Sequence, residues 1–388
     1  MQRMEPAFKV GGRIEPPYFM GREVILRVLV HDAASLSQSN VVIAPRRFGK
    51  TALLRAIESE TSNRMLAVYV NCLGLLGPAG FHDRVVEATL SAYEERHGKA
   101  QRLLATWRKL LKRPILAMRD ALEEIGGSFE GIGTVRLKLR TREIEEEALP
   151  RAALSFLEVF AKENDETVLL ILDEFQALAA RLQDLVPLLK EKMDSQRRVT
   201  YLFSGSSLGL LHEVFGDEAN SPLYQMVGRQ YLGEIETETV QKFLRDRLRE
   251  THDVTISSKA LDVATDCVGG IPYYVQKLGI ELERQILLEE RRRIGGDDVR
   301  KAFSYLIEEL GLDFQERWAG RYTEQQRRIL KTLAATPGGL TDVARQMGVP
   351  PENLSYNLNR LQSAMILARE GLIYRHVDHV FAAWLQAL

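Results

Sequence analysis

Short apolar segments alternate with helical patterns through the first two thirds of the chain. Residues 41–44, 66–71, 168–172 and 200–204 predict strands, and residues 230–235 are a weaker candidate. The segment 168–172 is apolar at every position, which is typical of a strand buried on both faces of a parallel sheet. Helical spacing of apolar residues lies before and between these segments, at 21–36, 51–60, 80–97, 148–163, 175–194 and 207–215. Strands that alternate with helices predict an α/β domain with a parallel sheet.

The stretch 98–147 interrupts this alternation and is interpreted as an insertion. Residues 99–125 have a helical pattern rich in Lys and Arg, and residues 133–142 alternate between apolar and basic positions. This alternation predicts an exposed strand with a basic outer face. Such a face is ordinarily only solvated, and contact with a partner or with nucleic acid is the alternative.

From residue 236 onward the pattern is helical, which predicts two further domains. Four helices with polar starts and glycine stops extend to residue 311, and residues 312–322 are interpreted as a connector. Three shorter helices and a β-hairpin over the last ~20 residues then predict a winged helix-turn-helix. The predicted domains are residues 1–235 with the insertion 98–147, residues 236–312 as a helical lid, and residues 313–388 as the winged helix.

Composition narrows the classes of protein. The chain has 388 residues with 52 Lys and Arg against 53 Asp and Glu, so the net charge of −1 excludes a globally basic nucleic-acid coat. Cys72 and Cys267 are the two cysteines, which excludes a disulfide framework and favours a reducing compartment. No apolar run approaches the ~18 residues of a membrane helix. The expected localisation is cytoplasmic, without a membrane partner.

The segment Ala44–Thr51 reads APRRFGKT and matches the pattern G-x-x-x-x-G-K-[ST] except at its first position. In such a loop, backbone N–H groups surround phosphate oxygens, Lys50 faces the β- and γ-phosphates, and the Thr51 hydroxyl ligates Mg²⁺. Ala44 can replace the first glycine if its φ remains negative. The preceding strand and following helix supply the context that this motif requires.

Two adjacent carboxylates end the apolar strand at 168–172. Because ligands bind at the carboxyl ends of the strands in a doubly wound sheet, Asp173 and Glu174 are expected beside the phosphate-binding loop. Asp173 would hold Mg²⁺ and Glu174 would polarise the attacking water. The alternative is a pair of acids that only caps a helix N-terminus.

Taken together, these segments resemble the archaeal-type P-loop ATPases of the STAND class, which are relatives of the AAA+ origin-recognition ATPases. The resemblance covers nearly the whole chain. It is carried by PYFMGRE at 17–23, APRRFGKTALL at 44–54, LLILDEFQAL at 169–178, YLFSGSS at 201–207, GGIPYYVQKLG at 269–279 and the C-terminal winged helix. The implied fold is an α/β P-loop NTPase with an AAA+-like core, followed by a helical lid and a winged helix.

The resemblance also implies further site residues. Phe19, Gly21 and Arg22 would border the adenine, and the strand of Ser204 would lie between the loop strand and the acidic strand and sense the γ-phosphate, with Ser206 as second choice. Arg229 would reach the γ-phosphate in its own or a neighbouring protomer, or be a plain surface arginine. The predicted catalytic residues are Lys50, Glu174, Ser204 and Arg229, and the predicted metal ligands are Thr51 and Asp173. The predicted nucleotide-binding residues are Phe19, Gly21, Arg22, Pro45, Arg46, Arg47, Phe48, Gly49, Lys50, Thr51, Ala52, Gly270, Pro272 and Tyr273.

The predicted function is an ATPase switch that uses ATP/ADP and Mg²⁺, in which the nucleotide sets the arrangement of lid and winged helix. The lid lacks an arginine of the AAA+ sensor type, which favours slow turnover. Two alternatives stay open: a DNA-binding ATPase and a non-hydrolysing nucleotide-bound scaffold. Residues 323–388 of the winged helix carry seven Lys and Arg against five Asp and Glu, so both DNA and a protein remain candidate partners. Nucleotide-dependent homo-oligomers and the choice between ATP and GTP also stay open.

The predicted exposed residues of the recognition helix are Asn353, Tyr356, Asn357 and Arg360. Asn can read adenine and Arg can read guanine. The apolar C-terminal segment 380–388 is expected to pack on the winged helix itself or on the lid.

Overall fold

The computed structural model describes residues 6–12, 14–98, 146–182, 184–206, 214–215, 221 and 223–388. The predicted basic strand at 133–142, most of the predicted insertion, and most of the predicted helix at 207–215 lie outside these residues. No helix of the described part is long and apolar enough to cross a membrane.

A parallel five-stranded sheet forms the centre of the N-terminal domain. Its strands are β1 (Ser39–Ile43), β2 (Leu66–Asn71), β3 (Val168–Asp173), β4 (Val199–Gly205) and β5 (Val227–Tyr231), in the spatial order β2-β3-β4-β1-β5. Strand β3 is buried throughout, as its uniform apolar sequence predicts. Strand β4 lies between the loop strand β1 and the acidic strand β3, so this expectation is confirmed.

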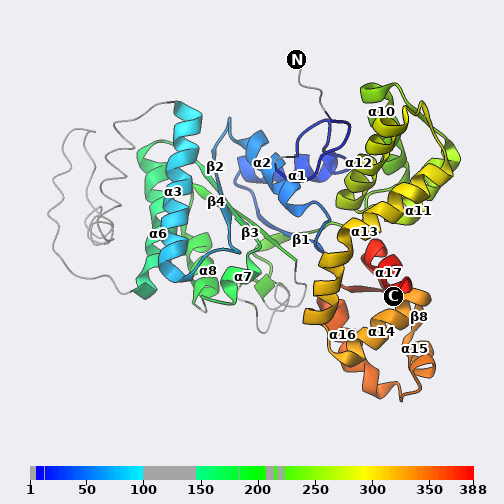
Figure 1. Cartoon of the computed structure of the whole chain (residues 1–388). Helices are drawn as coiled ribbons and strands as arrows, with labels where there is room; N and C mark the ends of the chain where they lie inside the picture. Colours follow the sequence, from blue (N-terminus) through cyan, green and yellow to red (C-terminus); the bar gives the residue numbers. More distant parts are fainter. Residues whose placement is uncertain are drawn as a thin grey trace.

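Helices cover both faces of the sheet (Figure 1). One face packs against α3 (Gly77–His97), α6 (Leu149–Glu163) and α8 (Leu185–Ser195), which together form one hydrophobic cluster with the sheet. The short elements η1 (Glu146–Ala148) and α7 (Gln176–Ala179) adjoin this layer. The other face packs against α1 (Glu23–Ala34) and α2 (Lys50–Thr61), and their cluster continues into the C-terminal domains.

The lid contains four helices: α10 (Thr237–His252), α11 (Ser258–Val268), α12 (Pro272–Glu289) and α13 (Gly296–Arg321), with a small pairing of β6 (Thr255–Ile256) and β7 (Arg293–Ile294). The winged helix follows as α14 (Glu324–Ala335), α15 (Leu340–Met347) and α16 (Glu352–Ser363). Its antiparallel sheet joins β8 (Gly338–Gly339), β9 (Leu367–Glu370) and β10 (Ile373–His376), and α17 (His379–Gln386) ends the chain.

Four element predictions differ from the structure. The helix predicted over 175–194 is the pair α7 and α8, because Pro187 lacks an N–H and fits only a first helical turn, where it now lies. Strand β5 begins at Val227 and ends at Tyr231, earlier than the predicted 230–235. The predicted connector 312–322 is helical to Arg321, since Phe314 is buried in the core, so the predicted boundary at 312/313 falls inside α13.

The fourth difference is at the C-terminus, where the predicted hairpin ends at His376 and is followed by the helix α17. Asp378 caps this helix, since its side chain accepts the N–H of Phe381. Buried Phe381 and Trp384 then contact Phe314 of α13. The apolar C-terminus therefore packs on both the winged helix and the helix that links it to the lid.

Candidate active site

The loop between β1 and α2 has the backbone shape of a phosphate-binding loop. Gly49 precedes α2 with φ +83°, in the left-handed region that favours glycine, and Arg47 also has a positive φ of +75°. Ala44 is not among the described residues with positive φ, which meets the condition for replacing glycine there. The free N–H groups at the start of α2 face the loop, an arrangement that favours anions.

Lys50 is buried at the base of this loop, with a side chain that is 5% exposed. Its Nζ donates hydrogen bonds to the carbonyl oxygens of Ala44 at 2.9 Å and Pro45 at 3.1 Å, and lies 3.9 Å from Oε1 of Glu174. Burial is the largest influence on the pKa of Lys50 and lowers it, while the carboxylates of Glu174 and Asp173 act in the opposite direction. The structure thus brings Lys50 and the two acids together.

Asp173 is the centre of a hydrogen-bonded cluster at the carboxyl ends of β2, β3 and β4. Its Oδ2 accepts hydrogen bonds from Thr51 at 2.9 Å and from the Tyr69 hydroxyl at 2.6 Å. Its Oδ1 accepts from the Ser204 hydroxyl and from the backbone N–H of Glu174 at 3.0 Å. Burial and the charge of Asp173 raise the pKa of Tyr69, which keeps its hydroxyl protonated as a donor.

The oxygen atoms of Thr51 and Asp173 fit a magnesium ion. Mg²⁺ prefers hard oxygen ligands and is usually bound through one or two carboxylates together with substrate phosphates. The two predicted metal ligands are already in contact beside Lys50, so the chemistry of this donor pair suits the predicted ion.

Glu174 has φ +54°, which is uncommon for a non-glycine residue and typical of functional sites. Its Oε2 accepts hydrogen bonds from Ser206 at 2.9 Å and from the amide of Gln176. The carboxylate is therefore held between the end of β4 and the start of α7, on the same side of the loop as Lys50.

Three distant segments meet at the predicted adenine side of the loop. The Arg22 guanidinium donates to the carbonyl of Gly233, and the N–H of Ile235 donates to Gly270 at 2.8 Å. A Cβ at Gly21 would lie 2.7 Å from the Ile235 side chain, and one at Gly270 would collide with the Ile235 backbone. Both glycines are therefore needed for close packing. The Arg22 guanidinium is already hydrogen-bonded to a backbone carbonyl.

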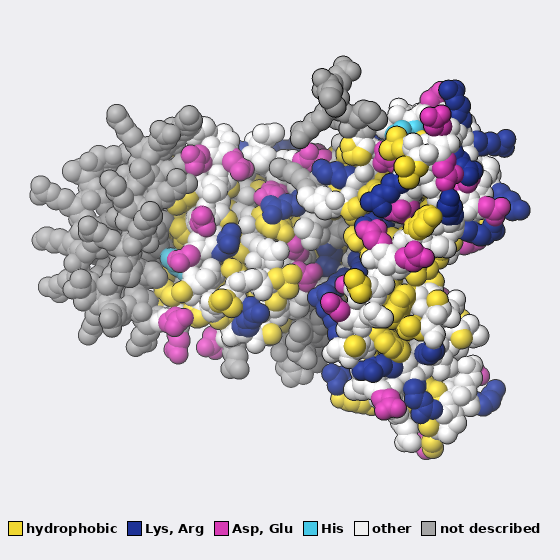
Figure 2. Space-filling view, in the orientation of Figure 1, with side chains coloured by type: hydrophobic (Ala, Val, Ile, Leu, Met, Phe, Trp, Pro, Cys, Tyr) yellow, Lys and Arg dark blue, Asp and Glu magenta, His cyan; other side chains and the backbone are white. Residues whose placement is uncertain are grey.

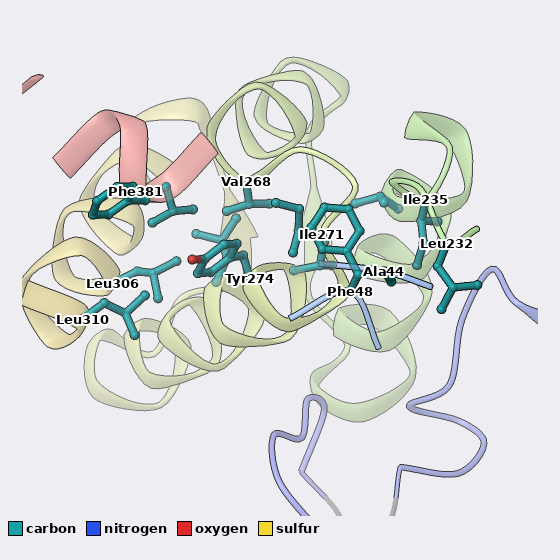
Figure 3. Packing of buried hydrophobic residues seen from close by; sticks show 14 of the residues in the cluster. Ala44, Phe48, Leu232, Ile235, Val268, Ile271, Tyr274, Leu306, Leu310 and Phe381 are labelled. Atoms are coloured by element: carbon teal, nitrogen blue, oxygen red, sulfur yellow. The ribbon is translucent and has the colours of Figure 1, made fainter. Parts of the chain in front are cut away.

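The lid helix α12 begins directly against the phosphate-binding loop. A Cβ at Gly49 would be 3.6 Å from the ring of Pro272, and the N–H of Tyr273 donates to the carbonyl of Arg47 at 3.3 Å. Phe48 is 4% exposed and packs in the core with Ala44 and Ile271, so its side chain is structural here (Figure 3). Ala52 is half-buried in the first turn of α2.

The side chain of Arg47 points into the C-terminal domains. Its guanidinium donates to the Tyr274 hydroxyl and to Asp313, and Nη1 lies 3.5 Å from Oδ2 of Asp378. Tyr274 donates to Asp378 at 2.8 Å, and Nη1 of Arg317 lies 3.2 Å from the same carboxylate. Burial and Asp378 raise the pKa of Tyr274 well above its usual value, so its hydroxyl stays a donor.

The side chain of Arg229, on β5, contacts other residues of the core. Its guanidinium donates to the carbonyl of Phe215 and lies over the ring of Tyr224, 5.6 Å from the centroid.

The predicted recognition helix is α16. Its residues Asn353, Tyr356 and Arg360 are exposed as predicted, whereas Asn357 is half-buried and donates to Gln325 of α14.

Sequence reasoning did not single out Tyr69, Gln176, Tyr274 and Asp378. Tyr69 has a detectable signal: Asn71 pairs with Asp173 in the parallel register, and positions two apart on a strand share a face, so Tyr69 lies on the side of the acid. Asp378 has a helix-capping signal before the apolar residues of α17. No pattern in the sequence marks Arg47, Tyr274 and Arg317 as its partners.

A five-stranded parallel sheet with this loop, the acidic strand two places away and a helical lid defines a P-loop ATPase with an AAA+-like core, followed by a winged helix. The chain belongs to the family of ATPase domains found predominantly in Archaea, whose model matches residues 19–278. Membership implies nucleotide binding by this domain.

Solved structures agree with the fold. The Walker-type ATPase PABY2304 of Pyrococcus abyssi is 19% identical, with a TM-score of 0.67, and the similarity covers 98% of this chain and 99% of that chain. The ORC2 protein of Aeropyrum pernix, solved as ADPNP–ADP complexes, is 16% identical with a TM-score of 0.57 over 98% and 97% of the two chains. A comparison with curated protein sequences gave no match.

Proposed function

We propose that the protein is a slow, magnesium-dependent ATPase switch of the STAND type, in which the bound nucleotide sets the position of the lid and the winged helix. The observation that carries this proposal is Arg47. It belongs to the phosphate-binding loop, yet its guanidinium is bonded to Tyr274 of the lid and lies 3.5 Å from Asp378 of the winged helix. A change in the loop backbone therefore acts directly on both C-terminal domains.

The chemistry assigns one task to each residue around the loop. Lys50 holds the terminal phosphates, Thr51 and Asp173 hold Mg²⁺, and Glu174 orients the attacking water. Ser204 and Tyr69 fix the Asp173 carboxylate by donating to both of its oxygens. Bound Mg²⁺ neutralises charge that develops on the phosphates. Phosphoryl transfer needs little beyond such positioning and charge stabilisation.

The switch itself requires that the nucleotide contact the two arrangements differently. Insertion of phosphates into the loop competes with the loop carbonyls for the Lys50 ammonium. Movement of the Ala44–Gly49 backbone then displaces Arg47 from a network that is largely shielded from water, with side chains of Arg47 and Asp378 only 18% and 14% exposed. The network thereby couples occupancy of the loop to docking of the winged helix.

A pair of variants tests the proposal. Lys50→Ala should abolish ATP binding, and Glu174→Gln should retain binding while hydrolysis falls at least ~100-fold. Glu60→Gln, exposed at the far end of α2, is the matched control and should behave as wild type. Binding is measured by calorimetry with a non-hydrolysable ATP analogue, and hydrolysis by phosphate release.

Normal hydrolysis by Glu174→Gln would refute the role of Glu174. Tight nucleotide retention without phosphate release by the wild type would instead indicate a scaffold. Wild-type binding to duplex DNA that weakens steeply with salt would identify a DNA-associated ATPase, because such binding depends on phosphate contacts.

A further inference from the structure

A cavity of about 880 Å³ separates the phosphate-binding loop from the end of α13 and the winged helix. Pro45, Arg46, Gln176 and Ser206 line it on the core side. The opposite side is lined by Arg317, Arg321 and Arg360 and by the carboxylates of Asp313, Glu316 and Asp378. In Figure 2, Lys and Arg side chains lie along this junction between the core and the winged helix, with Asp and Glu side chains among them.

The arginines that line this cavity differ in their contacts with carboxylates. Arg47 and Arg317 are paired with Asp378. Arg46 and Arg321 have no ion pair or hydrogen bond from their side chains within the part of the chain that the structure describes. These two exposed guanidinium groups line one cavity, one from the loop and one from the end of α13, and guanidinium groups placed in this way favour an anion between them.

The surroundings of these two arginines combine charges of both signs. Arg46 belongs to the phosphate-binding loop, and Arg321 is the last residue of α13. Burial lowers the pKa of Arg321, the positive charges of Arg46 and Arg317 lower it further, and the carboxylate of Asp313 acts in the opposite direction. Arg46 and Arg321 are therefore close enough to repel each other, and an anion between them would relieve this repulsion.

A buried acceptor on the cavity wall beside Glu174 lacks a hydrogen-bond donor among the described residues. Gln176 donates its amide to Glu174 and to Ser206, but its buried Oε1 has no partner among the described residues. A buried acceptor without a partner is costly, and a water molecule or a ligand donor would satisfy it. The cavity is therefore polar beside the water-orienting carboxylate, and its opposite wall carries arginines and carboxylates together.

We propose that Arg46 and Arg321 together bind the terminal phosphate of the nucleoside triphosphate held by the loop. This inference rests on the proposed ATPase switch. Arg321 is the last residue of α13, the helix that connects the lid to the winged helix. A third phosphate then attracts the end of α13, while a diphosphate leaves Arg321 without this anion, so the two nucleotides favour different positions of the winged helix.

The test compares triphosphate and diphosphate affinities by calorimetry in Arg321→Ala and Arg321→Lys. Arg321→Ala should weaken the non-hydrolysable ATP analogue by about tenfold, the size expected for a charged hydrogen bond. ADP affinity should change less than ~2-fold. Arg321→Lys, which keeps the charge but not the planar fork, should give an intermediate loss.

Arg345→Ala is the matched control, because Arg345 is 80% exposed on α15 of the same domain and does not line the cavity. It should leave both affinities unchanged. Equal losses for both nucleotides in Arg321→Ala, or no loss for the ATP analogue, would overturn this inference. Failure of the ATPase proposal would instead appear as undiminished ATP binding by Lys50→Ala.

Discussion

Two carboxylates, the buried Asp173 and the half-buried Asp378, organise two polar networks on either side of the phosphate-binding loop. The Asp173 network lies within the core and connects β3 to β2 through Tyr69, to β4 through Ser204 and to the first turn of α2 through Thr51. The Asp378 network crosses three domains. It includes a loop arginine, a lid tyrosine and an arginine of α13.

The Asp173 network holds the residues of the nucleotide site, whereas the Asp378 network connects the three domains. The Asp173 cluster is held by strands that pair in fixed register, so its geometry does not depend on the lid or the winged helix. The Asp378 cluster exists only while the winged helix is docked. We therefore expect its removal to alter domain arrangement first, whereas loss of a donor to Asp173 should affect the nucleotide site alone.

Asp378→Ala should have the largest effect of the substitutions that separate these networks. It leaves Arg47 and Arg317 without this carboxylate and removes the N-cap of α17. Unpairing these largely shielded ion pairs and losing a cap should together cost about 3 kcal/mol of docking stability. Hydrogen exchange in α17 should accelerate accordingly, and small-angle scattering should detect a more extended molecule.

The control for this substitution is Asp297→Ala, whose carboxylate is 99% exposed on α13. It should change stability by less than ~0.5 kcal/mol. Unchanged exchange of α17 in Asp378→Ala would show that apolar packing alone docks the winged helix.

Tyr69→Phe should have a smaller effect that is confined to the core. It removes one hydrogen bond to Asp173 and leaves the ring in place over Arg55. We expect a loss of about 1.5 kcal/mol in affinity for magnesium and nucleotide together, with exchange of α17 unchanged. Tyr305→Phe, exposed on α13, is the control, and faster exchange of α17 in Tyr69→Phe would show that the two networks are not separate.

Glu234→Gln should have the smallest effect. Glu234 accepts a hydrogen bond from His379 at 2.9 Å, and this contact, with His379 and Arg375 nearby, lowers its pKa. Because the folded pKa is below the unfolded value of ~4.3, the stabilisation is present above that value and lost as pH falls through the folded pKa. Half-exposed ion pairs contribute under ~1 kcal/mol.

The measurement is the thermal midpoint between pH 3 and pH 7 for Glu234→Gln and for Glu95→Gln, a control exposed on α3. The difference between wild type and Glu234→Gln should shrink as the pH is lowered. A constant difference across this range would show that the carboxylate charge does not contribute to docking of the winged helix.

Sequence patterns predicted the core better than the junctions. The uniformly apolar β3 and the acids that follow it identify the Asp173 side, because strand burial and strand-end position are local properties. The continuous α13 and the terminal α17 depend on what packs against them. Arg47 shows the limit most clearly: its motif assigns it to phosphate, but Asp378 lies 331 residues away in sequence and redirects it.

Helix α13 begins in the lid and ends at the winged helix, and it is continuous over 26 residues. At 1.5 Å per residue it is a rod of roughly 39 Å. A tilt of ~10° at the lid end therefore carries the far end through roughly 7 Å. Small rearrangements at the nucleotide are thus amplified mechanically, and the C-terminal lobe can be displaced without being unfolded.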